Sequence, residues 1–171
     1  MYFMELQRDT DPLTGVKNSN AYDRKVEEMK NKIKEHDNVK FAIAIFDIND
    51  LKIVNDNYGH SAGDKLIIRA AHLICDSFKH SPVYRIGGDE FVAIIENYDY
   101  QNREVIVREL HERIARIHEV STSRNSDTSV AFGVAVYNSN IDRDYISVFS
   151  RADKQMYDNK RLLKQNCKYK D

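Results

Sequence analysis

The sequence predicts one α/β domain, with a single mixed and mainly antiparallel sheet flanked by helices. Three observations lead to this prediction. The 171-residue chain has a length that suits one domain with its own core. The short apolar run at 41–46 is typical of a central strand that is buried on both faces. Gly87 and Gly88 lie between apolar runs and indicate a tight hairpin, because glycine takes positive φ without steric cost.

The other elements follow from apolar spacing and turn residues. In chain order we expect a helix capped by Asn18 or Ser19, the strand at 41–46, a helical turn at 50–57, a loop at 58–63, a helix around 66–78, the hairpin, a helix at 101–120, a polar loop at 121–127, a strand at 129–137 and a helix at 144–163. In the last helix, Ile146, Phe149, Ala152 and Met156 are expected to face inward. The order α-β-α-α-β-β-α-β-α describes one sheet covered by helices.

Composition narrows the function classes. A net charge of -1 gives no reason to expect nucleic acid or an anionic membrane as a partner. Cys75 and Cys167 match no zinc spacing and suit a reducing cytosol, and no transmembrane run or signal peptide is present, so we expect a cytoplasmic domain. His111 and His118 are expected to be solvated residues on a helix face.

Two acidic residues stand at predicted strand ends. Alternation places Asp47 on the side of Ile45 and Asp89 on the side of Phe91, and both carboxylates meet at one end of the sheet if the strands are neighbours. Like charges there are unfavourable, and Mg²⁺ removes the conflict by binding carboxylates, phosphate oxygens and carbonyls such as that of Ile48. The alternative is that the two acids cap helices or face water.

Three further residues point to a nucleotide. Lys52 lies one helical turn past Asp47 and could reach a phosphate. Asn55 and Asp64 bracket a glycine-bearing loop, and a carboxylate can accept two N–H bonds from a guanine edge while an amide pairs with its acceptors. Taken singly, Asp64 could instead start the following helix as a cap. Jointly these residues describe a purine nucleoside triphosphate bound with Mg²⁺.

Several motifs, in order, resemble the diguanylate cyclases that carry the GGDEF signature. They are GGDEF at 87–91, DPLTGVKN at 11–18, FDINDLKIVNDNYGHSAGD at 46–64, SVAFGVA at 129–135 and RADKQMYDNK at 151–160. The resemblance covers nearly everything from Arg8 to Asn166. It implies a fold like that of nucleotidyl cyclases and polymerase palms. The implied activity is condensation of two GTP molecules to cyclic di-GMP, a bacterial second messenger, with release of pyrophosphate.

The resemblance also implies a role for each matching residue. By family analogy Asp47, the Ile48 carbonyl and Asp89 bind Mg²⁺, or Mn²⁺ in its place. Asp89 and Glu90 help to deprotonate the ribose 3′-hydroxyl, and Lys52 stabilises charge on the phosphates. The other assigned residues contact the substrate: Lys160 and Lys164 at the β- and γ-phosphates, Asn55 and Asp64 at guanine, and His60 in the same loop.

The sequence departs from the family pattern at a few positions. Asn49 replaces a frequent Asp, and Lys164 replaces a frequent Arg, which keeps the charge but loses bidentate geometry. Many relatives carry Arg-x-x-Asp shortly before the glycines, where the product binds and inhibits. The matching residues here are Phe78 to Ser81, so we expect little product inhibition through that site.

These expectations define the domain organisation and its partners. Residues 1–10 are expected to be the end of an N-terminal linker helix, and 11–171 the GGDEF domain. GTP, a transient homodimer and an upstream sensor domain are the expected partners. The domain is expected in the cytoplasm, either free or as the cytoplasmic part of a membrane-anchored protein. Two other functions stay open: a non-catalytic module that binds GTP or a cyclic dinucleotide, and a structural dimerisation domain of a signalling protein.

Overall fold

The centre of the molecule is a four-stranded antiparallel sheet with the order β2-β3-β1-β4. The computed structural model describes residues 4, 8–36, 38–121 and 129–168. The strands are β1 (Ala42–Ile48), β2 (Val83–Arg85), β3 (Glu90–Ile95) and β4 (Val130–Val136). Each neighbouring pair of strands runs antiparallel, and one isolated parallel bridge joins Lys17 to Tyr84.

β1 lies between β3 and β4, and every one of its residues is buried. Antiparallel pairing places Phe46 opposite Phe91 of β3 and opposite Phe132 of β4, so aromatic rings gather near one end of the sheet. Phe46 and Phe132 stack with ring centroids 5.9 Å apart. A continuous apolar run predicts this position, since a strand covered on both faces has no polar side to present to water.

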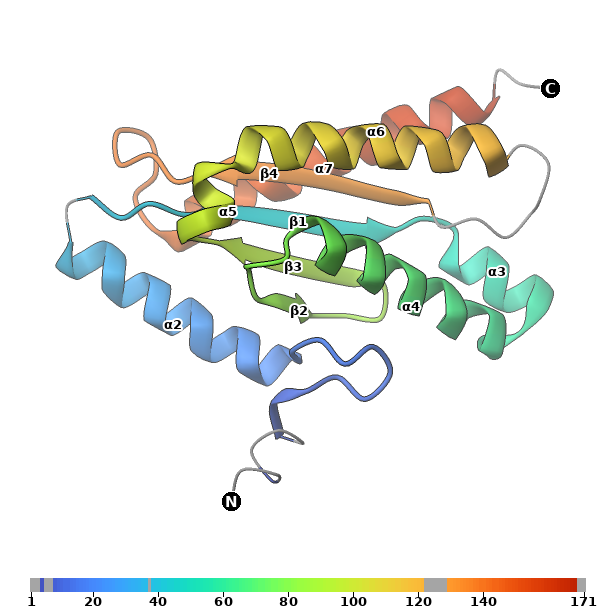
Figure 1. The fold of residues 1–171 in the computed structure, drawn as a ribbon, viewed down its shortest axis with the longest axis horizontal. Helices are drawn as coiled ribbons and strands as arrows, with labels where there is room; N and C mark the ends of the chain where they lie inside the picture. The colour runs from blue at the N-terminus through green and yellow to red at the C-terminus, as the bar shows by residue number, and fades with distance from the viewer. Residues whose placement is uncertain (1–3, 5–7, 37, 122–128, 169–171) are drawn as a thin grey trace.

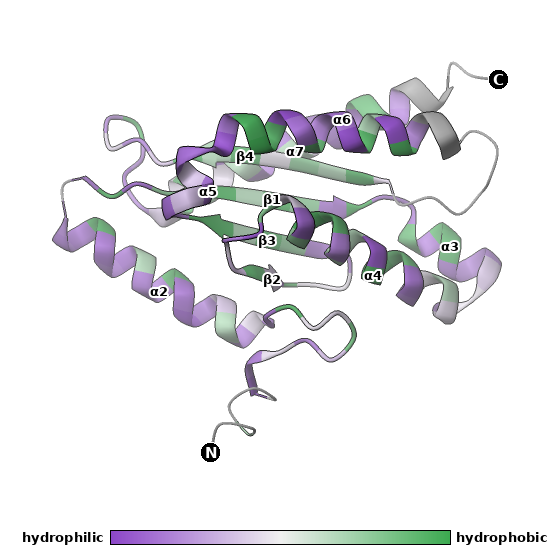
Figure 2. Cartoon of the chain, viewed as in Figure 1, coloured by the Kyte–Doolittle hydropathy of each residue, from purple (hydrophilic) through white to green (hydrophobic). Residues whose placement is uncertain are grey.

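Helices cover both faces of the sheet (Figure 1). One core contains side chains of α4 (His60–Ser77) and α6 (Arg103–Ser121), packed on Ala44, Phe46 and Phe91. The other core contains side chains of α2 (Ser19–Glu35) and α7 (Tyr145–Lys168), packed on Ile43, Ile45 and Val92. Figure 2 shows the strands as largely hydrophobic and the helices as mixed, as expected for helices with one face on a sheet.

Two short helices complete the domain. α3 (Leu51–Tyr58) follows β1 at the right-hand end of the sheet in Figure 1, and α5 (Asn97–Gln101) precedes α6. The predicted fold class and order of elements are confirmed, with α5 as an additional helix. Asn18 is the N-cap of α2, and its side chain accepts a hydrogen bond from the Ala21 N–H.

Some local predictions are wrong. The expected loop at 58–63 is almost absent, because Gly59, with φ of 86°, joins α3 directly to α4. The hairpin glycines Gly87 and Gly88 do not take positive φ; the positive-φ glycines are Gly15 and Gly59. Ile146 is 59% exposed and does not face the core. The predicted loop at 121–127 and much of the predicted linker at 1–10 lie outside the described residues.

Candidate active site

The end of β1 and the glycine turn are bound to each other through the backbone. The Ile48 N–H donates to the Asp89 carbonyl at 2.9 Å, and the Ile86 N–H donates to the Glu90 carbonyl at 3.0 Å. Asp47 lies directly opposite Glu90 in the β1–β3 register. The turn therefore brings three acidic side chains to one end of the sheet.

The Asp89 carboxylate lies close enough to Asp47 for its charge to raise the pKa of Asp47. The sequence analysis predicted that these two side chains lie close together, but it argued from strand alternation, which does not apply here. The face of β1 that carries Ile45 packs on α2 and α7, whereas Phe91 belongs to the core under α4 and α6. The two carboxyl groups meet because Asp89 lies in the turn, before β3 begins at Glu90.

Charge at this sheet end is only partly compensated. Asp47 is 8% exposed, and its Oδ2 accepts a hydrogen bond from Lys160 Nζ of α7 at 2.9 Å. Its Oδ1 is buried and has no partner. Burial raises the pKa of Asp47 and the Asp89 charge raises it further, while Lys160 opposes both. Burial together with the charges of Asp47 and Asp89 also raises the pKa of Glu90.

This donor set fits a hard divalent cation that is also held by a ligand. Mg²⁺ typically binds one or two carboxylates and completes its shell with phosphate oxygens and water. Asp47 and Asp89 provide two carboxylates, and the Oδ1 of Asp47 is buried without a partner. Within the described part of the chain, no group of three or more His, Cys, Asp or Glu side chains could hold a metal ion. A cation here would therefore need further oxygens from Ile48, a nucleotide or solvent.

Of the three predicted lysines, one contacts this acidic cluster and two are exposed on α3 and α7. Lys160 contacts Asp47 directly, and its pairing with a carboxylate was not foreseen. Lys164 lies one turn further along α7 and is exposed, as is Lys52 in the first turn of α3. Both side chains are therefore accessible from solvent.

The residues predicted to read guanine lie on the α3–α4 pair. Asn55 packs so tightly on α4 that a Cβ at Gly63 would stand 1.8 Å from the Asn55 Oδ1, which is buried without a hydrogen-bond partner. His60 and Asp64 are exposed in the first two turns of α4. The N-cap of α4 is Gly59, so Asp64 does not cap the helix and the alternative interpretation of that residue is excluded.

The sequence analysis missed a set of residues that brace the glycine turn. Arg85 donates from one terminal nitrogen to Asp11 at 3.2 Å and from the other to the Gly88 carbonyl at 2.9 Å. Burial raises the pKa of Asp11, but hydrogen bonds from Thr14 and the Arg85 charge outweigh it, so the pKa lies below its usual value. The motif at 11–18 could have indicated this contact, because Thr14 donates hydrogen bonds to Asp11 and Asp11 accepts one from Arg85.

A second missed network joins the end of β1 to α6. The Asn49 Nδ2 donates to Ser129 Oγ at 2.9 Å, and that hydroxyl lies 3.2 Å from His118 Nε2. The His111 ring centroid is 4.4 Å from that of Phe132. His111 is exposed on α6, as predicted, although its ring also contacts Phe132. His118 is half-buried beside Ser129, so the prediction of a solvated residue is wrong there.

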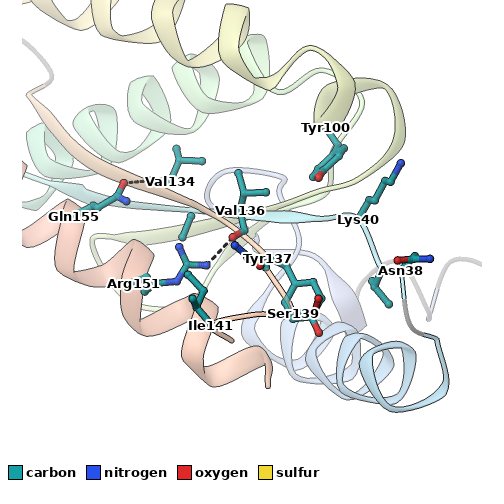
Figure 3. A pocket seen from close by; sticks show the side chains of 13 residues that line it. Asn38, Lys40, Tyr100, Val134, Val136, Tyr137, Ser139, Ile141, Arg151 and Gln155 are labelled. Carbon is teal, nitrogen blue, oxygen red and sulfur yellow. Dashed lines mark hydrogen bonds between the residues drawn. The ribbon is translucent and has the colours of Figure 1, made fainter. Parts of the chain in front are cut away.

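A separate pocket of about 560 Å³ lies at the other end of the sheet (Figure 3). Two of its polar side chains form hydrogen bonds with backbone groups on the free edge of β4. Gln155 accepts from the Val134 N–H at 3.2 Å, and Arg151 donates to the Val136 carbonyl at 2.6 Å. None of the predicted site residues lines this pocket. We therefore assign it a structural role in protecting an edge strand.

The fold is that of an α/β domain with a four-stranded antiparallel sheet, and comparison with known proteins identifies the family. The family model "Diguanylate cyclase, GGDEF domain" matches residues 8–166. This chain belongs to the GGDEF domain family.

Individual relatives agree with this assignment. The chain is 31% identical over 128 residues to the bifunctional diguanylate cyclase/cyclic di-GMP phosphodiesterase MucR of Pseudomonas aeruginosa. The matched residues cover 74% of this chain and 18% of that relative. It is similar to the crystal structure of the GGDEF domain of DgcB from Caulobacter crescentus in complex with c-di-GMP, with a TM-score of 0.68, 28% identity and 90% of each chain covered.

Relatives of other lengths also match. An uncharacterized membrane protein of Staphylococcus aureus is 27% identical over 150 residues, which cover 86% of this chain and 42% of that protein. The chain thus spans less than two thirds of the curated relatives named here. In its own described residues, no helix is long and apolar enough to cross a membrane.

Proposed function

We propose that this chain is a diguanylate cyclase, which condenses two GTP molecules into cyclic di-GMP and releases pyrophosphate. The observation that carries the proposal is the buried, unpartnered Oδ1 of Asp47 beside Asp89. Buried polar atoms in native proteins nearly always have a partner, and exceptions call for a functional reason. A ligand-held cation supplies that reason here.

Asp47, Asp89 and the Ile48 carbonyl would hold Mg²⁺, or Mn²⁺ in its place. When bound, the cation supplies charge neutralisation at the triphosphate. Lys160, which pairs with Asp47, and Lys164, one turn further along α7, would hold the β- and γ-phosphates. Lys52 at the start of α3 would stabilise charge that develops on the transferred phosphate.

Glu90 and Asp89 would accept the proton from the ribose 3′-hydroxyl of one GTP. The raised pKa of Glu90, caused by burial and then by its acidic neighbours, makes it a stronger base than an ordinary glutamate. The 3′-oxygen then forms a bond to the α-phosphorus of the second GTP. The bond from that phosphorus to the bridging oxygen breaks, and pyrophosphate leaves with the electron pair. A second, equivalent step closes the ring.

Asn55 of α3, with His60 and Asp64 in the first two turns of α4, would select guanine. Asp64 is free to accept N–H bonds because it does not serve as a helix cap. Adenine presents an acceptor at N1, which would face the carboxylate unpaired. Loss of a buried hydrogen bond of this kind is a strong basis for discrimination.

One such site holds one GTP, so the reaction needs two copies related by a two-fold axis. We therefore propose a transient homodimer, assembled in the cytoplasm by an upstream sensor domain or as part of a membrane-anchored protein. The isolated domain should be mainly monomeric and weakly active. Its turnover per molecule should rise with protein concentration.

The test is incubation with GTP and Mg²⁺, followed by mass spectrometry of the nucleotide product and measurement of pyrophosphate. The wild type should form cyclic di-GMP, Asp89→Ala should form none, and Asp76→Ala, a change at an exposed carboxylate of α4, should behave as the wild type. Binding of GTP without product would support the non-catalytic module instead. Absence of any nucleotide binding would support a structural dimerisation domain.

A further inference from the structure

A cavity of about 470 Å³ lies between α3 and α4, on the side of this helix pair that faces away from the proposed guanine site. Its walls are mainly apolar and aromatic, with two basic side chains; they consist of Val54, Tyr58, Ser61, Ala62, Lys65, Leu66 and Arg69. A cavity of this volume suits a small molecule rather than a helix or a strand.

The lining residues of α4 lie on one face of that helix. Ala62, Leu66 and Arg69 recur at a spacing of three to four residues, whereas His60 and Asp64 lie roughly on the opposite side of a helix with 3.6 residues per turn. No residue assigned to GTP or to the metal lines the cavity. The cavity is therefore a separate site.

The chemistry of the walls selects an aromatic anion. Leu66 is 4% exposed and forms an apolar base, and the Tyr58 ring is 57% exposed, so it offers a flat surface for stacking. Lys65 is an exposed lining residue, and none of the seven residues that line the cavity is acidic. An acidic group on a planar ligand would pair with Lys65.

We propose that this cavity binds a small aromatic anion, with a planar apolar body and one acidic group, and that its occupancy changes the affinity for GTP. The coupling half rests on the proposed function. α3 and α4 touch through Asn55 and Gly63, where a Cβ would stand only 1.8 Å from the Asn55 Oδ1. A ligand that fills the cavity between Val54 and Leu66 contacts both helices and fixes their spacing, and with it the position of Asn55.

The probe is 8-anilinonaphthalene-1-sulfonate, an aromatic sulfonate whose fluorescence rises in apolar surroundings. Its binding should saturate and should shift the backbone amide NMR signals of Val54, Tyr58, Ala62 and Leu66. Lys65→Glu should weaken binding about tenfold, the factor that corresponds to one lost charge-assisted hydrogen bond. Ala62→Leu, which fills the cavity with a residue that favours helices, should weaken it as much.

Lys34→Glu makes the same charge change on α2, far from the cavity, and should leave binding unchanged. Circular dichroism of each variant excludes loss of fold as the cause. Probe binding that is unchanged in both Lys65→Glu and Ala62→Leu, or amide shifts confined to other regions, would overturn the site. At saturating probe, the affinity for a non-hydrolysable GTP analogue should change about fivefold. Unchanged affinity would overturn the coupling, whereas a protein that binds the probe but no GTP analogue would overturn the proposed function and leave the site standing.

Discussion

Two buried aspartates at opposite ends of the sheet differ in how their oxygens are satisfied. Asp142, 4% exposed, accepts from Arg151 at 2.9 Å on Oδ1, and on Oδ2 from the same guanidinium at 2.5 Å and from the Asn138 N–H at 2.8 Å. Asp47, 8% exposed, accepts one bond from Lys160 and leaves Oδ1 without a partner. The first carboxylate fixes a loop, whereas the second retains capacity for a ligand.

Under the proposed function, Asp47 is a position at which this fold gives up stability for ligand binding. A saturated carboxylate contributes to stability, because its burial is matched by hydrogen bonds. Asp47 instead has a neighbouring carboxylate that raises its pKa, on top of the effect of burial. Strained electrostatics of this kind tends to mark functional sites.

The largest expected effect is that of Asp47→Asn on catalysis. The amide cannot replace a charged metal ligand, so product formation should fall about a thousandfold, as loss of several kcal/mol of charge stabilisation implies. Without metal, the variant should unfold at the same or higher urea concentration than the wild type, because one of the clustered negative charges is gone. Near-normal turnover would show that Asp47 is not a ligand.

Asp142→Asn should have the opposite profile. It weakens the part-buried hydrogen bonds that Arg151 and Asn138 donate to this carboxylate, so the free energy of unfolding should fall by roughly 2 kcal/mol. Urea denaturation measures this change. The initial rate of product formation at low temperature, where the variant stays folded, should match the wild type; a folded variant with lost activity would remove the contrast between the two aspartates.

Arg85→Lys tests the bracing of the glycine turn. Lysine can contact Asp11 or the Gly88 carbonyl but cannot bridge them as the guanidinium does. We expect kcat to fall about tenfold, the equivalent of one charge-assisted hydrogen bond, with little change in KM. A purely structural role would lower the melting temperature and leave kcat of the folded protein unchanged.

The pH dependence of stability should differ between the wild type and Asp47→Asn. Because the pKa of Asp47 is raised in the folded state, its favourable neutral form is present below the unfolded value of about 3.8, and the stability it contributes is lost as pH rises through the folded value. Without metal, the wild type should therefore gain stability relative to the variant as the pH falls from neutral toward 3.8. Urea denaturation at about pH 7 and about pH 4 gives the difference, and a constant difference would contradict the raised pKa.

The smallest expected effect concerns product inhibition. Asp99, 1% exposed, is a third buried carboxylate, and its Oδ2 accepts from the His80 N–H at 3.0 Å and from Ser81 Oγ at 2.7 Å. The segment at 78–81, which the sequence analysis aligned with the inhibitory motif of the family, is thus engaged internally, and Phe78 is buried. Added cyclic di-GMP should leave the initial rate nearly unchanged. Tight product binding that is lost on replacing Lys79 or His80 would show otherwise.

Much of this architecture could be predicted from local sequence. The run at 41–46 has no polar alternation, which left a doubly covered strand as the best interpretation, and helix spacing located α4 and α6. The proximity of Asp47 to Asp89 depended on strand order, which periodicity does not specify. Alternation also failed at Asp89, because a turn residue does not follow the pleat of the strand behind it.

Other features were out of reach because they depend on contacts distant in sequence. The Arg85 bridge joins residues more than seventy positions apart, and the Asn49–Ser129–His118 network joins three separate elements. The composition of residues 58–63 did not indicate that α3 is followed directly by α4. Gly59 and its polar neighbours read as a loop, although one residue with positive φ was enough to end one helix and start the next.

Calorimetric titration of Mn²⁺ tests the central claim most directly, with the protein saturated by a GTP analogue that has a methylene group between the α- and β-phosphates. The wild type and Asp142→Asn should bind the ion with the same affinity, and Asp47→Asn should bind it about a hundredfold more weakly, as the loss of a charged oxygen ligand predicts. Equal affinity in all three proteins would show that the unpartnered oxygen at the end of β1 is not a metal ligand.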